Sequence, residues 1–101
     1  MTEQELNRAV QYVTGRTSYG RDTVAQIIET GFAELTALAG TSTQVFEREA
    51  LLEYVCRWTM VKTGQPEPLV REVLGCAGRW LDELYESLGR PPSRLLKGHE
   101  N

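Results

Sequence analysis

The chain has 101 residues, of which 41% are hydrophobic and 25% are charged, a balance typical of one small soluble globular domain. Its formal net charge of −3 gives no overall electrostatic basis for binding nucleic acid. No apolar run approaches the about 20 residues that cross a bilayer, so the sequence does not predict a membrane protein.

The first predicted helix covers residues 3–14. The segment TEQE at its start is a capping box, in which the Thr2 hydroxyl and the Glu5 carboxylate each accept a hydrogen bond from a free amide of the first turn. Gly15 is predicted to end this helix in the left-handed conformation, which a residue without a side chain adopts at little cost.

The second helix is predicted over residues 23–39, with Asp22 as its N-cap and Gly40 as its end. Its apolar residues recur at helical spacing, which indicates one buried face. These residues are Val24, Ile27, Ile28, Gly31, Phe32, Leu35 and Leu38.

The third helix is predicted to end near Thr63, before Gly64, and residues 41–44 offer several N-caps for its start. Its apolar residues cover much of the helix surface, a wider face than one neighbouring helix needs. They are Leu51, Leu52, Val55, Cys56 and Trp58. We therefore predict that this helix is the central element of the fold.

The fourth helix is predicted over residues 67–88. Pro66 and Pro68 suit its first turn, where a missing amide hydrogen costs nothing, and Gly89 ends it. Its apolar stripe consists of Val70, Val73, Leu74, Ala77, Leu81, Leu84 and Leu88. From this stripe we expect Leu81 and Leu84 to be buried.

These elements predict an all-α fold, a four-helix bundle of two helical hairpins over residues 1–89. No segment shows the sustained alternation of apolar and polar residues that predicts a strand. Cys56 and Cys76 each lie within a predicted helix and are expected to be buried free thiols, which suits a reducing cytoplasm.

Residues 90–101 are predicted to form a flexible basic tail. This tail has three basic residues and one acidic residue, whereas the first 89 residues have 8 basic and 13 acidic residues and a charge of −5. Pro91 and Pro92 prevent the last helix from continuing. We expect the tail to bind a partner through Arg90, Arg94, Leu95, Leu96 and Lys97. The alternative is a disordered end that only increases solubility.

The side chains that carry chemistry do not form a recognised site. His99 is the only histidine and lies in the tail, and together with Cys56 and Cys76 it does not give a zinc-binding spacing. The acidic residues that could pair for acid–base catalysis lie on faces predicted to be solvated. They are Glu47, Glu49, Asp82, Glu83 and Glu86. We therefore expect a non-enzymatic protein that holds no metal or cofactor.

Two further patterns allow both a functional and a structural interpretation. Residues 14–20 place two glycines and several hydroxyls before a helix N-terminus, but they lack a Walker lysine and a preceding strand, so a plain loop is favoured. Four aromatic residues could stack on bases, but they fall on or beside the apolar stripes, which favours packing in a core or interface. These are Tyr54, Trp58, Trp80 and Tyr85.

Residues 22–85 resemble the phage head–tail connector (head-completion adaptor) family. The resemblance lies in an acidic residue that opens a helix (DTVAQIIETGFAELTALAG), a helix that closes on Arg-Trp (ALLEYVCRW), and a Pro-containing turn before a last helix (LVREVLGCAGRWLDELY). It implies a small helical subunit in a homo-oligomeric ring between portal and tail, with portal or tail proteins as partners, non-specific DNA contact at most, and a place in the virion. The helix at residues 3–14 departs from the family pattern.

Residues 1–40 also resemble the helical hairpin that opens HU-type DNA-binding proteins, in the early capping turn, the Thr-Gly pair and the aliphatic second helix. Those proteins continue into strands and a basic arm, whereas residues 44–88 of this chain are predicted to be helical. The alternative function is therefore a small cytoplasmic regulator that binds protein or nucleic acid through the first helix and the basic tail.

Overall fold

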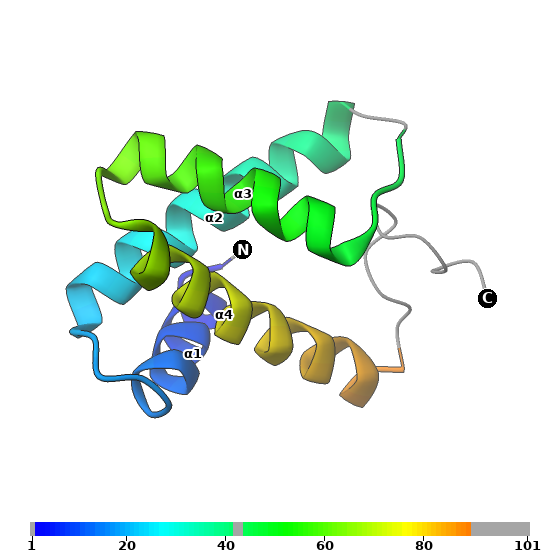
Figure 1. Cartoon of the computed structure of the whole chain (residues 1–101). Coiled ribbons are helices and arrows are strands. Elements are labelled where there is room, and N and C mark those ends of the chain that lie inside the picture. Colours follow the sequence, from blue (N-terminus) through cyan, green and yellow to red (C-terminus); the bar gives the residue numbers. More distant parts are fainter. Residues whose placement is uncertain (1, 42–43, 90–101) are drawn as a thin grey trace.

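The computed structural model describes residues 2–41 and 44–89, which form four helices (Figure 1). These are α1 (Glu3–Thr14), α2 (Arg21–Thr41), α3 (Arg48–Thr63) and α4 (Glu67–Ser87). Within the described ranges the only strand-type feature is an isolated bridge at Phe46. The predicted all-α fold of two helical hairpins is therefore confirmed, and the predicted tail lies outside the described residues.

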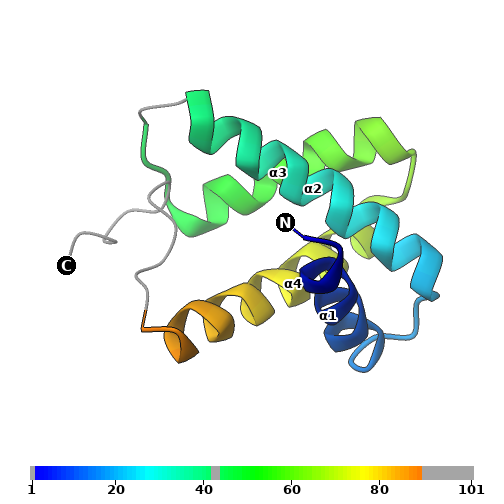
Figure 2. The same ribbon diagram turned by 180° about the vertical axis from the view of Figure 1, so that it is seen from behind.

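Helices α2 and α4 form the centre of the bundle. Each of them packs against the other three helices, whereas α3 packs against α2 and α4 and has no contact with α1 (Figures 1 and 2). The prediction that α3 is central is therefore wrong. The two central helices are also the longest, with 21 residues each, against 12 in α1 and 16 in α3.

The core lies where all four helices overlap. Its buried apolar side chains are Ala9, Val10, Val13, Val24, Ile27, Ile28, Phe32, Leu51, Val55, Cys56, Val70, Val73, Leu74, Cys76 and Ala77. Gly31 of α2 is also buried and lets α2 approach α4 closely, because a Cβ atom there would lie 2.8 Å from Cδ2 of Leu74. The predicted apolar face of α2 is buried from Val24 to Phe32, while Leu35 and Leu38 are only half-buried.

The two helices of the α3–α4 hairpin do not lie side by side along their whole length. The two helices lie close together near their connection and diverge towards the start of α3 and the end of α4, on the right of Figure 1. As a consequence Leu81 and Leu84, which the stripe of α4 predicted to be buried, are only half-buried. The periodicity of one helix defines a face, but the distance to the neighbouring helix decides how deeply that face is buried.

The helix ends agree in part with those predicted from the sequence. The capping box of α1 is present, since the Glu5 amide donates to Thr2 Oγ1 at 3.1 Å and the Thr2 amide donates to Glu5 Oε1 at 2.9 Å. The hydrogen bond that the Glu5 carboxylate accepts from the Thr2 amide, followed by its hydrogen bond with the Thr2 side chain, holds the pKa of Glu5 below its usual value. Gly64 has the left-handed φ of 71° at the end of α3, but Gly15 is right-handed with a φ of −72°, contrary to the prediction.

The boundaries around α2 differ more from the prediction. The helix begins at Arg21, so Asp22 lies in its first turn and is not the N-cap. It continues through Gly40 to Thr41, whose hydroxyl donates to the Ala37 carbonyl at 2.9 Å and is therefore used within α2. The N-cap of α3 is accordingly not among residues 41–44 but is Glu47, which makes no side-chain cap hydrogen bond.

Both cysteines are buried free thiols, as predicted. Burial raises the pKa of the Cys56 thiol, so the reactive thiolate is scarce at neutral pH. We expect both cysteines to react slowly with a thiol reagent in the native protein and rapidly once the protein is unfolded in urea. Fast labelling of the native protein would contradict their burial, and an intact mass lower by the two hydrogens that a disulfide removes would contradict their free state.

Thr59 is a buried polar residue at the middle of α3, and its hydroxyl has no hydrogen-bond partner within the described residues. A buried, unsatisfied hydroxyl costs about 1–3 kcal/mol, so the isosteric Thr59→Val change is expected to raise the free energy of unfolding by about 1 kcal/mol. Urea denaturation measures this change. Thr63→Val is the control, because the Thr63 hydroxyl donates to the Thr59 carbonyl at 2.7 Å and its loss should not stabilise. A destabilised Thr59→Val protein would show that the hydroxyl is satisfied by a buried water.

Candidate functional site

The described part of the chain contains no group of three or more His, Cys, Asp or Glu side chains placed to hold a metal ion. None of its helices is both long enough and apolar enough to cross a bilayer. The surface features that the described residues do offer are two exposed apolar regions on different sides of α3.

The first region, which we call the cleft, is a cavity of about 590 Å³ that opens between the diverging ends of α3 and α4 and is backed by the second half of α2. Its lining is mostly apolar. The lining residues are Phe32, Leu35, Thr36 and Ala39 of α2, Arg48, Leu51, Leu52 and Val55 of α3, Leu74, Gly75, Gly78, Arg79, Trp80, Leu81, Asp82, Leu84 and Tyr85 of α4, and Glu5 of α1.

Two glycines keep the α4 side of the cleft open. Gly75 and Gly78 lie in the interior of α4, and a Cβ atom built on either one would meet no other described atom within 4 Å. Glycine within a helix destabilises it by about 0.5–1 kcal/mol relative to alanine. Because close packing does not require a glycine at either position, their effect is to weaken α4 slightly and to leave space beside Leu74 and Leu81.

Charged side chains lie at the mouth of the cleft. Arg48 Nη1, at the start of α3, is 2.8 Å from Asp82 Oδ2 of α4, and the exposed fractions of the two side chains are 58% and 42%. Ion pairs between exposed side chains contribute only about 0–1 kcal/mol, so this pair joins the two walls of the mouth weakly. The mouth can therefore admit another chain segment without the loss of a strong interaction.

The second region, which we call the α3 stripe, consists of Tyr54, Trp58 and Val61. These side chains are spaced four and three residues apart, so they lie along one side of α3, and their exposed fractions are 40%, 37% and 83%. Trp58 lies over a shallow groove between α3 and α2, and the Lys62 ammonium is 4.8 Å from the centre of its ring. Exposed aromatic residues are enriched in protein interfaces.

The tyrosine of the stripe is fixed by a polar contact. The Tyr54 hydroxyl donates a hydrogen bond to the Glu34 carboxylate of α2. This hydrogen bond, together with partial desolvation, raises the pKa of Tyr54. The contact anchors the end of the ring and leaves its face towards solvent, which suits a preformed contact surface.

Known proteins offer no further guide to these two regions. A scan against family models finds no match. Searches of curated proteins and of solved structures find no similar protein. The connector and HU-type resemblances therefore remain predictions.

The acidic side chains that were considered for catalysis lie mainly at the surface, as expected. Glu47, Glu49, Glu83 and Glu86 are exposed, and Asp82 is half-buried in its contact with Arg48. Tyr12 donates to Glu83 Oε1 at 3.3 Å. Asp82 and Glu83 are thus engaged in surface contacts between helices.

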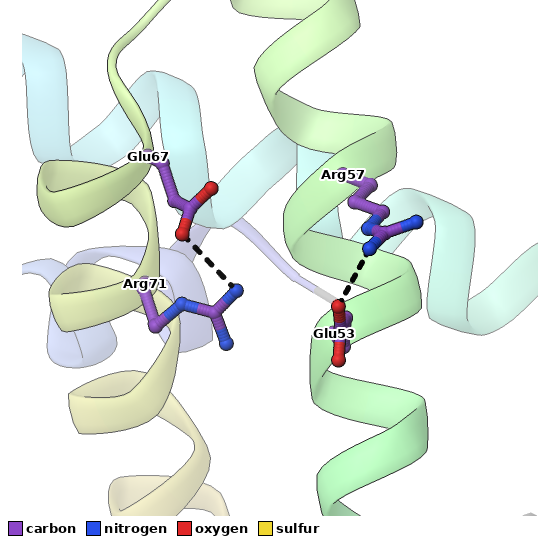
Figure 3. Close-up of polar contacts among 4 residues, drawn as sticks. All are labelled: Glu53, Arg57, Glu67 and Arg71. Atoms are coloured by element: carbon purple, nitrogen blue, oxygen red, sulfur yellow. Dashed lines mark hydrogen bonds and ion pairs between the residues drawn. The ribbon is translucent and has the colours of Figure 1, made fainter.

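The outer faces of α3 and α4 carry further ion pairs within single helices (Figure 3). Glu53 Oε1 is 2.8 Å from Arg57 Nη2, and Glu67 Oε1 is 3.6 Å from Arg71 Nη2. Both pairs are spaced four residues apart and point to solvent, where each contributes about 0.3–0.5 kcal/mol. They mark the solvated faces of the two helices.

The loop at residues 14–20 behaves as a structural connection. The Thr17 hydroxyl donates to the Val13 carbonyl at 2.9 Å, and the Arg16 guanidinium lies 3.6 Å from the centre of the Tyr12 ring while donating to the Tyr12 carbonyl. The Thr17 hydroxyl and the Arg16 guanidinium therefore contact the last turn of α1. The plain-loop interpretation is the one that fits these contacts.

The aromatic residues do not share one environment. Tyr54 and Trp58 lie in the exposed stripe, whereas Trp80 and Tyr85 are half-buried and line the cleft.

The predicted partner-binding residues of the tail lie outside the described residues. They are Arg90, Arg94, Leu95, Leu96 and Lys97. The first helix, which the regulator alternative uses for binding, presents exposed Glu3 and Arg8 and buries Ala9, Val10 and Val13 in the core.

Sequence reasoning did not anticipate the cleft, although one signal for it was present. Gly75 and Gly78 interrupt an otherwise strong helical segment, and glycines inside a helix often mark a close contact or an open space. The signal for the α3 stripe was the excess width of the apolar face of α3. That width was attributed to a central position, whereas part of it faces solvent.

Proposed function

We propose that this protein is a non-enzymatic interaction subunit that assembles head-to-tail with copies of itself, and that a phage head–tail connector is the most concrete form of this function. The observation that carries the proposal is the presence of two apolar surfaces, the cleft and the α3 stripe, on different sides of one helix. A ring needs two different, complementary surfaces on each subunit.

The positions of the two surfaces support continued assembly. The α3 residues that line the cleft (Arg48, Leu51, Leu52 and Val55) lie in the first half of the helix, whereas the stripe lies further along it. At about 100° per residue the mean directions of the two sets around α3 differ by about 100°. A second copy that contacts the stripe therefore leaves the cleft accessible to a third. Two copies that used only one of these surfaces would instead stop at a two-fold dimer.

The chemistry of the two surfaces is complementary. The stripe consists of two aromatic side chains and a valine, and the cleft is a mostly apolar concavity with two glycines, Gly75 and Gly78, in its lining. Aromatic anchors that fill apolar pockets contribute most of the energy of many interfaces. In the proposed contact, the stripe of one copy enters the cleft of the next.

For the connector form, the ring would lie in the virion between portal and tail. Portal or tail proteins are then its neighbours, and DNA passes through the ring with non-specific contact at most. This part of the proposal is supported by the sequence resemblance of residues 22–85 and by the all-α fold, which is the fold that the resemblance implies.

Light scattering over a wide concentration range, alone and with a portal ring, tests this function. Trp58→Lys places a charge in the stripe, and Gly78→Lys places one in the cleft without removing any packed side chain. Gln11→Lys, on the exposed side of α1, is the control for added charge. We expect the native protein and the control to exceed the monomer mass of 11.4 kDa, and both surface variants to remain monomers. A native protein that stays monomeric under all these conditions would refute head-to-tail assembly.

A further inference from the structure

The cleft has a nearby candidate occupant within the same chain. The last turns of α4 supply Leu81, Leu84 and Tyr85 to the cleft wall, and residues 90–101 follow directly after this helix. Leu88, at the end of α4, is apolar and 56% exposed. The apolar surface therefore continues from the cleft towards the point where the tail begins.

The end of α4 changes the direction of the chain. Gly89 has a left-handed φ of 67°, and its amide donates to the Glu86 carbonyl at 3.1 Å. A left-handed glycine after the last helical turn closes the helix and sends the following residues away from its axis. Gly89 therefore ends α4, and the tail is attached at the end of the helix that supplies one wall of the cleft.

The length of the tail matches the length of the cleft. Along α4 the lining extends from Leu74 to Tyr85, which at 1.5 Å per residue is about 16 Å, and Gly89 lies about 6 Å beyond Tyr85. Leu95 is six residues after Gly89, so an extended chain can place it up to about 20 Å from that glycine. The two tail leucines can therefore reach most positions along the cleft.

The charges of the tail and of the helix end are complementary. The tail has three basic residues and one acidic residue, while the part of the chain before it has a charge of −5. The last two turns of α4 contain Asp82, which lines the cleft, and Glu83 and Glu86, which are exposed on the same turns. Attraction of this kind favours the tail at the mouth and weakens as salt rises.

We propose that residues 90–101 dock in the cleft of their own chain, with Leu95 and Leu96 as apolar anchors and Arg90, Arg94 and Lys97 next to the acidic last turns of α4. Docking within one chain is favoured because the tether gives the tail a high effective concentration at the cleft. The docking itself is independent of the proposed function. Its consequence for assembly rests on that function: the tail competes with the stripe of a second copy, so the cleft is covered until assembly displaces the tail.

The fluorescence of Trp80 provides a direct test, because Trp80 lines the cleft and Trp58 lies on the stripe. In a Trp58→Phe background Trp80 is the only tryptophan. The full-length chain carrying Leu95→Ser and Leu96→Ser is compared with one carrying Gly98→Ser and Asn101→Ser, which adds two serines to the same tail but keeps the leucines. We expect a red-shifted Trp80 emission and stronger acrylamide quenching in the leucine variant only. Adding a synthetic peptide of residues 90–101 to that variant should reverse both changes.

The outcomes separate this inference from the proposed function. Equal Trp80 emission and quenching in the two tail variants, with native far-UV circular dichroism, would overturn docking of the tail. A Trp80 protection that disappears on dilution would also overturn it, because the occupant would then be a second copy. If docking holds and the stripe enters the cleft during assembly, light scattering should show stronger self-association for the leucine variant than for its control.

Discussion

Truncation of Leu74 to alanine is expected to lower the free energy of unfolding by about 2–5 kcal/mol, as removal of a core leucine does. Leu74 is only 3% exposed and lies against the close contact between α2 and α4 at Gly31. Leu81→Ala is expected to cost about 1 kcal/mol, because a half-buried leucine has lost only part of its contact with water. Urea denaturation of both variants measures the difference.

The two leucines are a matched pair, with the same side chain at two positions on one face of α4. The apolar stripe of α4 predicted that both leucines are buried. In the structure Leu74 is buried in the core, whereas Leu81 is half-buried at the wall of the cleft. If Leu81→Ala were as costly as Leu74→Ala, Leu81 would be covered in solution, either by the docked tail or by α3 packed against the end of α4. Only the second case would mean that the cleft as described is absent.

Replacement of a glycine by alanine is expected to change the free energy of unfolding in opposite directions at Gly31 and at the two glycines of α4. Gly31→Ala places a Cβ atom 2.8 Å from Leu74 Cδ2 and 3.3 Å from Val55 Cγ1, so these side chains must shift. Overpacking of this kind costs about 1–3 kcal/mol and should outweigh the better helix propensity of alanine. Gly75→Ala and Gly78→Ala meet open space and should each raise the free energy of unfolding by about 0.5–1 kcal/mol.

The three glycine variants share one chemical change, which makes the sign of each effect informative. Thermal or urea denaturation is sufficient, because the expected values differ in sign and not only in size. A stabilised Gly31→Ala protein would show that Leu74 moves freely into the cleft. Destabilisation at Gly75 or Gly78 would show that another group fills the space beside α4.

The features that could be predicted from the sequence are local. The capping box at Thr2 and Glu5, the left-handed stop at Gly64 and the buried face of α2 depend on residues within a few positions of each other. The burial of Cys56 and Cys76 follows from their places in strongly helical segments. For these features the sequence contains most of the determining interactions.

The features that could not be predicted depend on distances between helices. A wide apolar face such as that of α3 is compatible with a central helix or with an exposed stripe, and only the packing of α2 and α4 excludes the first. Leu81 and Leu84 repeat at core spacing, but the divergence of the α3–α4 hairpin opens a cleft beside them. The start of α3 was misplaced, because α2 continues to Thr41 and α3 begins at Arg48.

In the proposed assembly, the cleft and the α3 stripe are the two halves of one head-to-tail contact. The most direct measurement is light scattering on an equimolar mixture of Trp58→Lys and Gly78→Lys proteins. Each variant keeps the surface that the other has lost, so a single intact contact can form between them, and the chain of contacts cannot extend.

With this contact, each variant alone is expected to have the monomer mass of 11.4 kDa, and the mixture is expected to give a species of twice this mass and no larger one. The Gln11→Lys control, which retains both surfaces, should continue to assemble beyond the dimer. A mixture that remains monomeric at concentrations where the control assembles would contradict the claim.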